Sequence, residues 1–141
     1  MSTIKPLHLS LKWKWFDMIE SGEKRFEYRA LTPYFCQKFL LCLGEVKTQS
    51  YWKMILDNFK KDNIEPHDGI KNLIDFEIFS YRPYSRLVLS KGYSKNRLTF
   101  EYRPPVFSTG RTTWGAEPGV FYFCLLLNPI NKLDYEAMED I

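Results

Sequence analysis

Four charged residues near the start of the chain have side chains that could do chemistry together. They are Lys12, Lys24, Glu27 and Arg29. The three cations could contact a phosphate or a base and clamp an anion, and the carboxylate could transfer a proton. The same residues could instead form a ladder of ion pairs across neighbouring strands, which adds little stability when it is exposed. Composition alone favours the ladder.

The spacing of these residues limits how they can act together. In a regular strand Glu27 and Arg29 lie on one face, because side chains alternate between the two faces, and Lys24 lies on the other. Lys24 can join the other two only if the chain bends just after Gly22.

The surrounding sequence predicts the elements that hold these side chains. Leucines at alternate positions from 7 to 11 have the period of a half-buried strand. Trp15, Phe16 and Ile19 then follow at the spacings of a short helix, and Gly22 is a signal for its C-terminal end. The segment 7–29 is therefore predicted to be a strand, a short helix, a glycine turn and a charged strand.

The rest of the chain predicts one α+β domain of about six or seven strands with two or three short helices, built as a curled sheet or small barrel. Strands are expected at 39–43, 74–78, 85–90, 98–102 and 120–127, and a helix at 51–60 after a cap at Thr48 or Ser50. Pro33 predicts a turn or loop, 62–71 a polar connector, and 107–119 a loop long enough for a functional role. The domain is expected to span 1–141, with a core at about 5–130.

Charge is unevenly distributed along the sequence. The net charge is +3, but the tail at 131–141 has one cation against four acids, so the remaining residues carry +6. The window 81–111 alone holds seven cations against one acid, interleaved with four tyrosines. This window predicts either ordinary solvated loops and strand edges or a surface for an anionic partner, with nucleic acid the first choice.

Several classes of protein are disfavoured by what the sequence contains. No segment approaches the ~20 apolar residues that span a bilayer, and the first residues lack the apolar run of a signal peptide. Cys36, Cys42 and Cys124 lie among apolar residues and are expected to be reduced and buried. His8 and His67 have no partners at metal-binding spacing, so neither a metal nor a cofactor is expected. These features predict a cytoplasmic protein without a membrane partner.

The segment LHLSLKWKWFDMIESGEKRFEYR resembles the N-terminal signature of the ASCH superfamily, which is related to PUA domains. The matching positions are Leu9, Ser10, Leu11, Lys12, Trp15, Phe16, Ile19, Gly22, Lys24, Glu27, Tyr28 and Arg29. Weaker likenesses continue to about residue 130, including Gly92-Tyr93 and Trp114-Gly115.

The resemblance implies a small PUA-like β-barrel with a cleft, into which the Gly-x-Lys and Glu-x-Arg residues point. It also implies a function on RNA or nucleotides, since members of the family bind RNA, cleave RNA or hydrolyse acetylated cytidine. The last group uses a threonine three residues after the lysine as its nucleophile, and this chain has Glu27 there. A carboxylate replaces that hydroxyl poorly in amide hydrolysis, so that activity is not expected.

Two functions follow as hypotheses, and binding is the favoured one. In the first, the protein binds RNA, single-stranded nucleic acid or a nucleotide in a basic, aromatic-lined cleft. Its binding residues would be Lys12, Lys24, Arg29, Tyr93, Arg111 and Trp114. In the second, it is a hydrolase of RNA or a modified nucleoside, with Glu27 as general base and Lys24 or Arg29 stabilising the developing charge. A third alternative is an interaction domain with no role in nucleic-acid binding.

Overall fold

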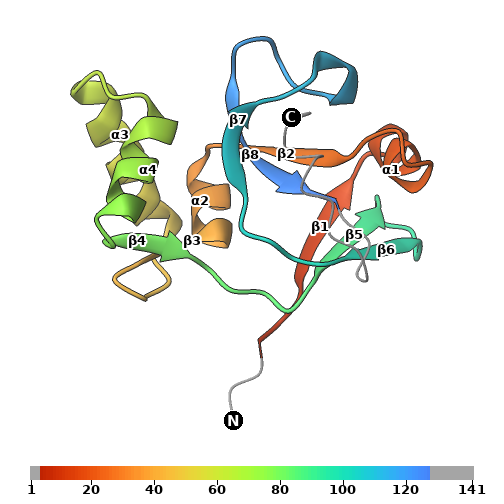
Figure 1. Cartoon of the computed structure of the whole chain (residues 1–141). Coiled ribbons are helices and arrows are strands. Elements are labelled where there is room, and N and C mark those ends of the chain that lie inside the picture. Colours follow the sequence, from red (N-terminus) through yellow and green to blue (C-terminus); the bar gives the residue numbers. More distant parts are fainter. Residues whose placement is uncertain (1–3, 128–141) are drawn as a thin grey trace.

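The fold combines helices and strands along the whole of the described chain (Figure 1). The computed structural model describes residues 4–127, so the acidic tail predicted at 131–141 lies outside the described residues. In chain order the elements are β1 (Leu7–Leu11), α1 (Trp13–Glu20), β2 (Phe26–Ala30), α2 (Pro33–Phe39), β3 (Leu40–Cys42), α3 (Gln49–Lys61), α4 (Pro66–Asp75), β4 (Phe79–Tyr81), β5 (Leu87–Lys91), β6 (Arg97–Phe100), β7 (Val106–Thr109), a 3₁₀ turn η1 (Thr112–Trp114) and β8 (Phe121–Leu126). The predicted α+β class is confirmed.

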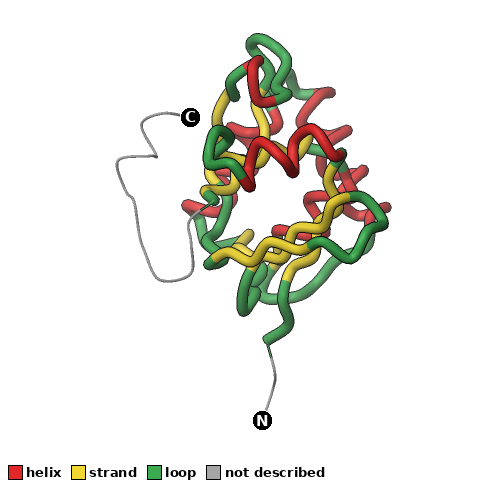
Figure 2. Tube along the Cα trace, turned by 90° about the vertical axis from the view of Figure 1, so that its right-hand side faces the viewer, coloured by secondary structure: helices red, strands yellow, loops and turns green. Residues whose placement is uncertain are grey.

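The strands form three sheets instead of the one curled sheet or barrel that was predicted. Their orders are β1-β5-β6, β2-β8-β7 and β3-β4, and among residues 4–127 they do not join into one closed barrel. In the side view of Figure 2, the strands gather in two groups with the front helix, α1, across the space between them. The described chain has eight strands and four α-helices, more than the six or seven strands and two or three helices predicted.

The strand β1 is buried on one face, as its alternation predicts. Leu7, Leu9 and Leu11 are in the core, and the residues between them are exposed. β1 pairs in parallel with β5, so Leu7 lies beside Leu87 and Leu9 beside Leu89. Parallel pairing requires a crossover, and here most of the chain between residues 11 and 87 supplies it.

Two helices were missed by the sequence analysis. Pro33, read as a turn or loop, is the first residue of α2, and the hydroxyl of Thr32 accepts a hydrogen bond from the Phe35 amide to cap that helix. Proline is suited to the first helical position because it lacks a backbone N–H, and an N–H at that position would have no partner within the helix. Pro66 likewise begins α4, which replaces the predicted connector at 62–71.

The prediction of a strand at 74–78 is also wrong, because α4 extends into that segment. α4 continues to Asp75, Phe76 is 76% exposed, and Glu77 adopts a positive φ of 62°, which no strand allows. The alternation there arises where one turn of helix meets a tight turn. The predicted loop at 107–119 is partly wrong, because it contains most of β7 and the turn η1.

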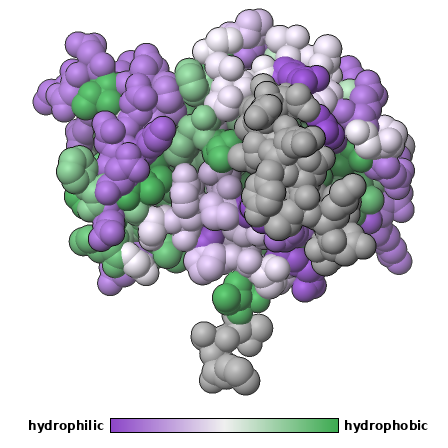
Figure 3. Space-filling model, in the orientation of Figure 1, coloured by the Kyte–Doolittle hydropathy of each residue, from purple (hydrophilic) through white to green (hydrophobic). Residues whose placement is uncertain are grey.

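The other predicted elements are confirmed with small shifts in their ends. α3 begins after Thr48, whose hydroxyl accepts a hydrogen bond from the Tyr51 amide at 3.1 Å. β5 and β6, at the predicted strands 85–90 and 98–102, pair as an antiparallel hairpin, and β8 is the central strand of its sheet. The surface over α3 and α4 is mostly hydrophilic (Figure 3), consistent with apolar residues of both helices packing inward.

One cluster of buried side chains connects the sheets with the helices. Phe39 of α2 lies 4.9 Å from Phe123 of β8 between ring centroids, and Trp52 of α3 lies 4.9 Å from Phe79 of β4. A smaller cluster of Phe26, Trp114, Cys124 and Leu126 lies beneath the sheet β2-β8-β7. None of the helices within residues 4–127 combines the length and the apolar character needed to cross a membrane.

The three cysteines are buried free thiols, as predicted, and two of them, Cys36 and Cys124, make the stability depend on pH. Burial raises the pKa of Cys36 from 9.0 to about 12. Burial also raises the pKa of Cys124 to about 12, because it outweighs the lowering effect of the hydrogen bond to the Ser108 backbone. The folded protein therefore keeps protons that the unfolded chain releases near pH 9. This stabilisation is complete below pH 9 and is lost as the pH rises from 9 towards 12.

We expect the free energy of unfolding, measured by urea denaturation, to fall steadily between pH 9 and about pH 11. Cys36→Ala, which removes one of the two thiols whose pKa is raised, should make this fall shallower. An identical slope in the variant and the wild type would show that the Cys36 thiol does not cause the effect.

Candidate functional site

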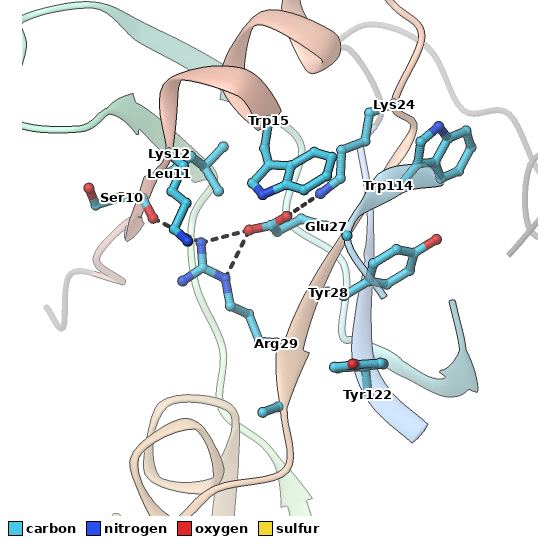
Figure 4. Close-up of a pocket in the computed structure, with 12 residues that line it drawn as sticks. Ser10, Leu11, Lys12, Trp15, Lys24, Glu27, Tyr28, Arg29, Trp114 and Tyr122 are labelled. Carbon is cyan, nitrogen blue, oxygen red and sulfur yellow. Dashed lines mark hydrogen bonds and ion pairs between the residues drawn. The ribbon is translucent and has the colours of Figure 1, made fainter. Parts of the chain in front are cut away.

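A pocket of about 290 Å³ opens where the two three-stranded sheets and α1 meet (Figure 4). It is lined by the end of β1, the start of α1, the residues around β2, the turn η1 and one residue of β8. Its lining residues are Ser10, Leu11, Lys12, Trp15, Lys24, Glu27, Tyr28, Arg29, Ala30, Trp114, Gly115 and Tyr122.

A network of three charges, two of them buried and one partly buried, forms one side of the pocket. The Lys24 ammonium donates to Oε1 of Glu27 at 2.5 Å, and Arg29 donates to Oε2 from Nε at 2.9 Å and from Nη2 at 2.7 Å. Nη2 of Arg29 also donates to the backbone oxygen of Ser10 at 3.0 Å, which fixes β2 to β1. Lys24 and Glu27 are the two charged residues buried in the described chain, with Lys24 only 2% exposed. Such a network holds its members in fixed positions.

The bend that this network requires occurs at Gly22. Gly22 has a φ of 85°, in the left-handed region that glycine adopts easily. The amide of Lys24 then donates to the oxygen of Met18 at 2.9 Å, so the chain folds back on the end of α1 before β2 begins at Phe26. Lys24 thus precedes the strand, so the alternation of side chains along β2 does not set its direction. The bend after Gly22, which the sequence requires if Lys24 is to join Glu27 and Arg29, is present.

Aromatic rings form much of the remaining wall. Tyr28 and Tyr122, from adjacent strands, lie 5.8 Å apart between ring centroids. The Lys24 ammonium lies 5.3 Å from the Trp15 ring and 5.4 Å from the Tyr28 ring, within range of a cation–π interaction. Trp15 packs so close to Gly115 that a Cβ there would lie 3.0 Å from the ring. The pocket therefore offers both ring surfaces and charge.

Tyr28 is held as a neutral phenol. Its oxygen accepts a hydrogen bond from the Arg111 amide at 3.0 Å. Burial raises its pKa above the ordinary value of 10.0, and this outweighs the opposing effects of that hydrogen bond and the Arg111 charge. At neutral pH the hydroxyl therefore keeps its proton and can donate a hydrogen bond to an acceptor on a ligand.

The charge of the pocket favours anions. Three cations line it against one carboxylate, and Figure 4 shows the Lys12 side chain directed toward the Arg29 guanidinium. Lys12 is exposed, whereas Arg29 is partly buried. Two converging cations repel each other, so an anion bound between them is stabilised by both.

The structure brings together five of the predicted site residues and leaves two outside the pocket. Those lining it are Lys12, Lys24, Glu27, Arg29 and Trp114. Arg111 lies beside it, with Cζ 4.6 Å from the centroid of the Trp114 ring. Tyr93 is fully exposed in the turn between β5 and β6 and does not line the pocket.

Three aromatic lining residues were not predicted as site residues. Tyr28 and Tyr122 meet because β2 pairs with β8, and a single sequence does not reveal that pairing. Trp15 was placed on one face of its helix with Phe16 and Ile19, but it is only partly buried, whereas those two residues are buried. A signal was present, since Trp13 and Trp15 are two residues apart and such positions point to different sides of a helix.

The described residues offer no alternative site based on a metal. Across residues 4–127 there is no group of three or more histidine, cysteine, aspartate or glutamate residues placed to hold a metal ion.

Comparisons with known proteins give no assignment for this fold and pocket. No family model, no curated protein and no solved structure matches the chain. The features that point to a function are therefore the pocket's geometry and the sequence motif that forms it.

Proposed function

We propose that this protein binds RNA or another single-stranded nucleic acid, or a nucleotide, through the pocket between β1, α1 and β2. The observation that carries the proposal is the combination of a net positive charge with partly exposed aromatic rings in one pocket. Phosphates require cations, and unpaired bases require ring surfaces on which to stack. A pocket for an apolar metabolite has no need of three cations.

Each part of the pocket has a role in this proposal. Lys12 and Arg29 would hold a phosphate, because they converge near the pocket's edge. Trp15 and Tyr28 would stack on a base or border it. Glu27 is fixed by two cations, and its oxygens could accept a hydrogen bond from an amino group of the base.

We further propose that the chain is an ASCH-type, PUA-like protein that works in the cytoplasm. The order of strand, short helix, glycine turn and strand at residues 7–30 supports this proposal. So does the position of Lys24, Glu27 and Arg29 at one pocket, as the motif implies. The two facing groups of strands are compatible with a barrel-like arrangement that stays open. The three free thiols suit a reducing compartment.

Binding should weaken strongly with salt. If Lys12 and Arg29 contact phosphates, the affinity for a labelled single-stranded RNA should fall about sevenfold between about 50 mM and 200 mM salt. Fluorescence anisotropy at the two concentrations measures this. Lys12→Gln should weaken binding and lower the salt dependence by the amount expected for about one phosphate contact. Lys61 is an exposed lysine at the end of α3, and Lys61→Gln should change neither the affinity nor the salt dependence.

Two outcomes would contradict the binding proposal. One is the absence of any binding of RNA or nucleotides at low salt. The other is an affinity that is indifferent to salt, because phosphate contacts always release counterions.

A hydrolase acting on RNA or a modified nucleoside is the second candidate, and one contact favours it. The Lys24 ammonium and the Glu27 carboxylate lie 2.5 Å apart at the pocket wall, a pair that could pass a proton. Incubating labelled RNA and a panel of nucleosides with the wild type and with Glu27→Gln tests it. Loss of turnover in the variant, with its fold intact, would support the hydrolase. Equal turnover by the variant and the wild type would show that Glu27 is not the general base.

A further inference from the structure

A second aromatic and basic surface lies outside the pocket, where α1 faces the turn between β5 and β6. We call it the turn patch, and it consists of Trp13, Tyr93, Lys95 and Arg97. Trp13 is 64% exposed and Tyr93 is fully exposed, although both are large rings that proteins ordinarily bury at least in part. The binding pocket makes no use of either ring.

The turn patch is continuous with the pocket through Ser10. The backbone oxygen of Ser10 accepts a hydrogen bond from Arg29 in the pocket at 3.0 Å. The hydroxyl of the same residue donates to the oxygen of Gly92 in the turn at 3.3 Å, and the Gly92 amide donates to the oxygen of Leu11 at 2.8 Å. The pocket and the turn are thus attached to the same end of β1.

Trp13 is held in place, although it is exposed. The Lys91 ammonium lies 5.0 Å from its ring and also pairs with Asp17 at 2.7 Å. The indole Nε1 lies against Gly92, where a Cβ would be only 3.1 Å away. Gly92 has a φ of 54°, so glycine suits both the turn and this close approach. A ring fixed in this way loses little freedom when a ligand stacks on it.

The charge around these rings is positive. Lys95 and Arg97 are exposed in the turn, where the Arg97 guanidinium donates to the backbone oxygens of Ser94 and Asn96. The acid on the adjoining face of α1, Asp17, is paired with Lys91 and so adds little negative charge to the surface. Exposed rings among cations are the features that bind single strands, whose bases stack on rings while their phosphates lie near lysine and arginine.

We propose that the turn patch is a second subsite, which binds the nucleotides next to the one in the pocket. This inference rests on the proposed function and deepens it, because it makes the ligand a single-stranded oligonucleotide instead of a free nucleotide. A duplex does not fit this role, since its bases are already stacked and their faces are hidden.

The experiment compares a nucleoside monophosphate with a single-stranded RNA of about six nucleotides, a length within the range of known single-strand sites. Wild type should bind the RNA much more tightly than the monophosphate. Trp13→Ala and Tyr93→Ala should each reduce the affinity for the RNA between about fivefold and about 100-fold, the range expected for losing one stacked base. The advantage of RNA over the monophosphate should shrink accordingly. Both measurements use isothermal titration calorimetry.

Phe76→Ala is the matched control, because Phe76 is an exposed ring at the end of α4, on the opposite side of the molecule from α1 (Figure 1). It should leave the affinity for RNA unchanged. Tyr93→Ala removes a side chain that packs on nothing, so it tests the subsite even if Trp13→Ala disturbs the fold. A poly-glutamate peptide of similar charge should bind far more weakly than RNA.

The outcomes separate the two proposals. If neither the monophosphate nor the RNA binds the wild type, the proposed function fails, and the subsite fails with it. If the wild type binds both ligands but Tyr93→Ala and Trp13→Ala bind RNA as wild type does, the pocket stands and the subsite is overturned. Equal losses in Phe76→Ala, or equal binding of poly-glutamate, also overturn it.

Discussion

In urea denaturation, Glu27→Leu should lower the free energy of unfolding by about 3–5 kcal/mol. The carboxylate of Glu27 bonds to Lys24 and Arg29, and the variant would leave both cations without it. Arg29 is 18% exposed at its side chain and keeps its bond to Ser10, but Lys24 is 2% exposed. An uncompensated ammonium in that position has lost its water and its partner, which is the main source of the loss.

Two further variants isolate this cause. Lys24→Met combined with Glu27→Leu should recover most of the stability, because replacing both buried charges by apolar groups is often neutral or better. Asp57→Leu breaks the pair with Lys53, in which both side chains are more than half exposed, and should cost less than about 1 kcal/mol. A Glu27→Leu cost as small as that of Asp57→Leu would mean that Lys24 is not buried with Glu27.

Trp52→Ala should also lower the free energy of unfolding by about 3–5 kcal/mol, but for a different reason. Trp52 is completely buried between α3 and the sheet β3-β4, where it packs edge-on against Phe79 at 4.9 Å. The substitution removes the apolar contact and leaves a cavity that the rigid sheet does not fill. Urea denaturation measures the loss.

The size of the side chain should set this cost. Trp52→Phe keeps a ring and should lose less than Trp52→Ala, whereas Phe76→Ala, which removes an exposed ring, should change the free energy by less than about 0.5 kcal/mol. Similar losses for Trp52→Ala and Phe76→Ala would place Trp52 at the surface, contrary to the structure.

The elements that could be predicted from the sequence are those whose signal is local. The alternation of Leu7, Leu9 and Leu11 predicts β1 correctly, and Thr48 marks the start of α3. The two missed helices also had a local signal, since Pro33 and Pro66 each stand at a first helical position. Proline was interpreted as a break, although it is equally suited to begin a helix.

The candidate site was predictable in its charges and less so in its rings. Lys24, Glu27 and Arg29 are close in sequence, so only the bend at Gly22 was needed to bring them together. Tyr122 is far from them along the chain and reaches the pocket because β8 pairs with β2. Long-range pairing depends on packing across the whole fold, and a single sequence carries no direct record of it.

The pairing of β2 with β8 also determines when the pocket can exist during synthesis. The ribosome releases β2, with Lys24 and Glu27, long before it releases β8, which is the last strand of the described chain. Until then the edge of β2 has no partner, and Tyr122 is missing from the wall. Distant pairing of this kind slows folding and exposes strand edges in the meantime. The pocket wall is therefore complete only after β8, with Tyr122, has left the ribosome and paired with β2.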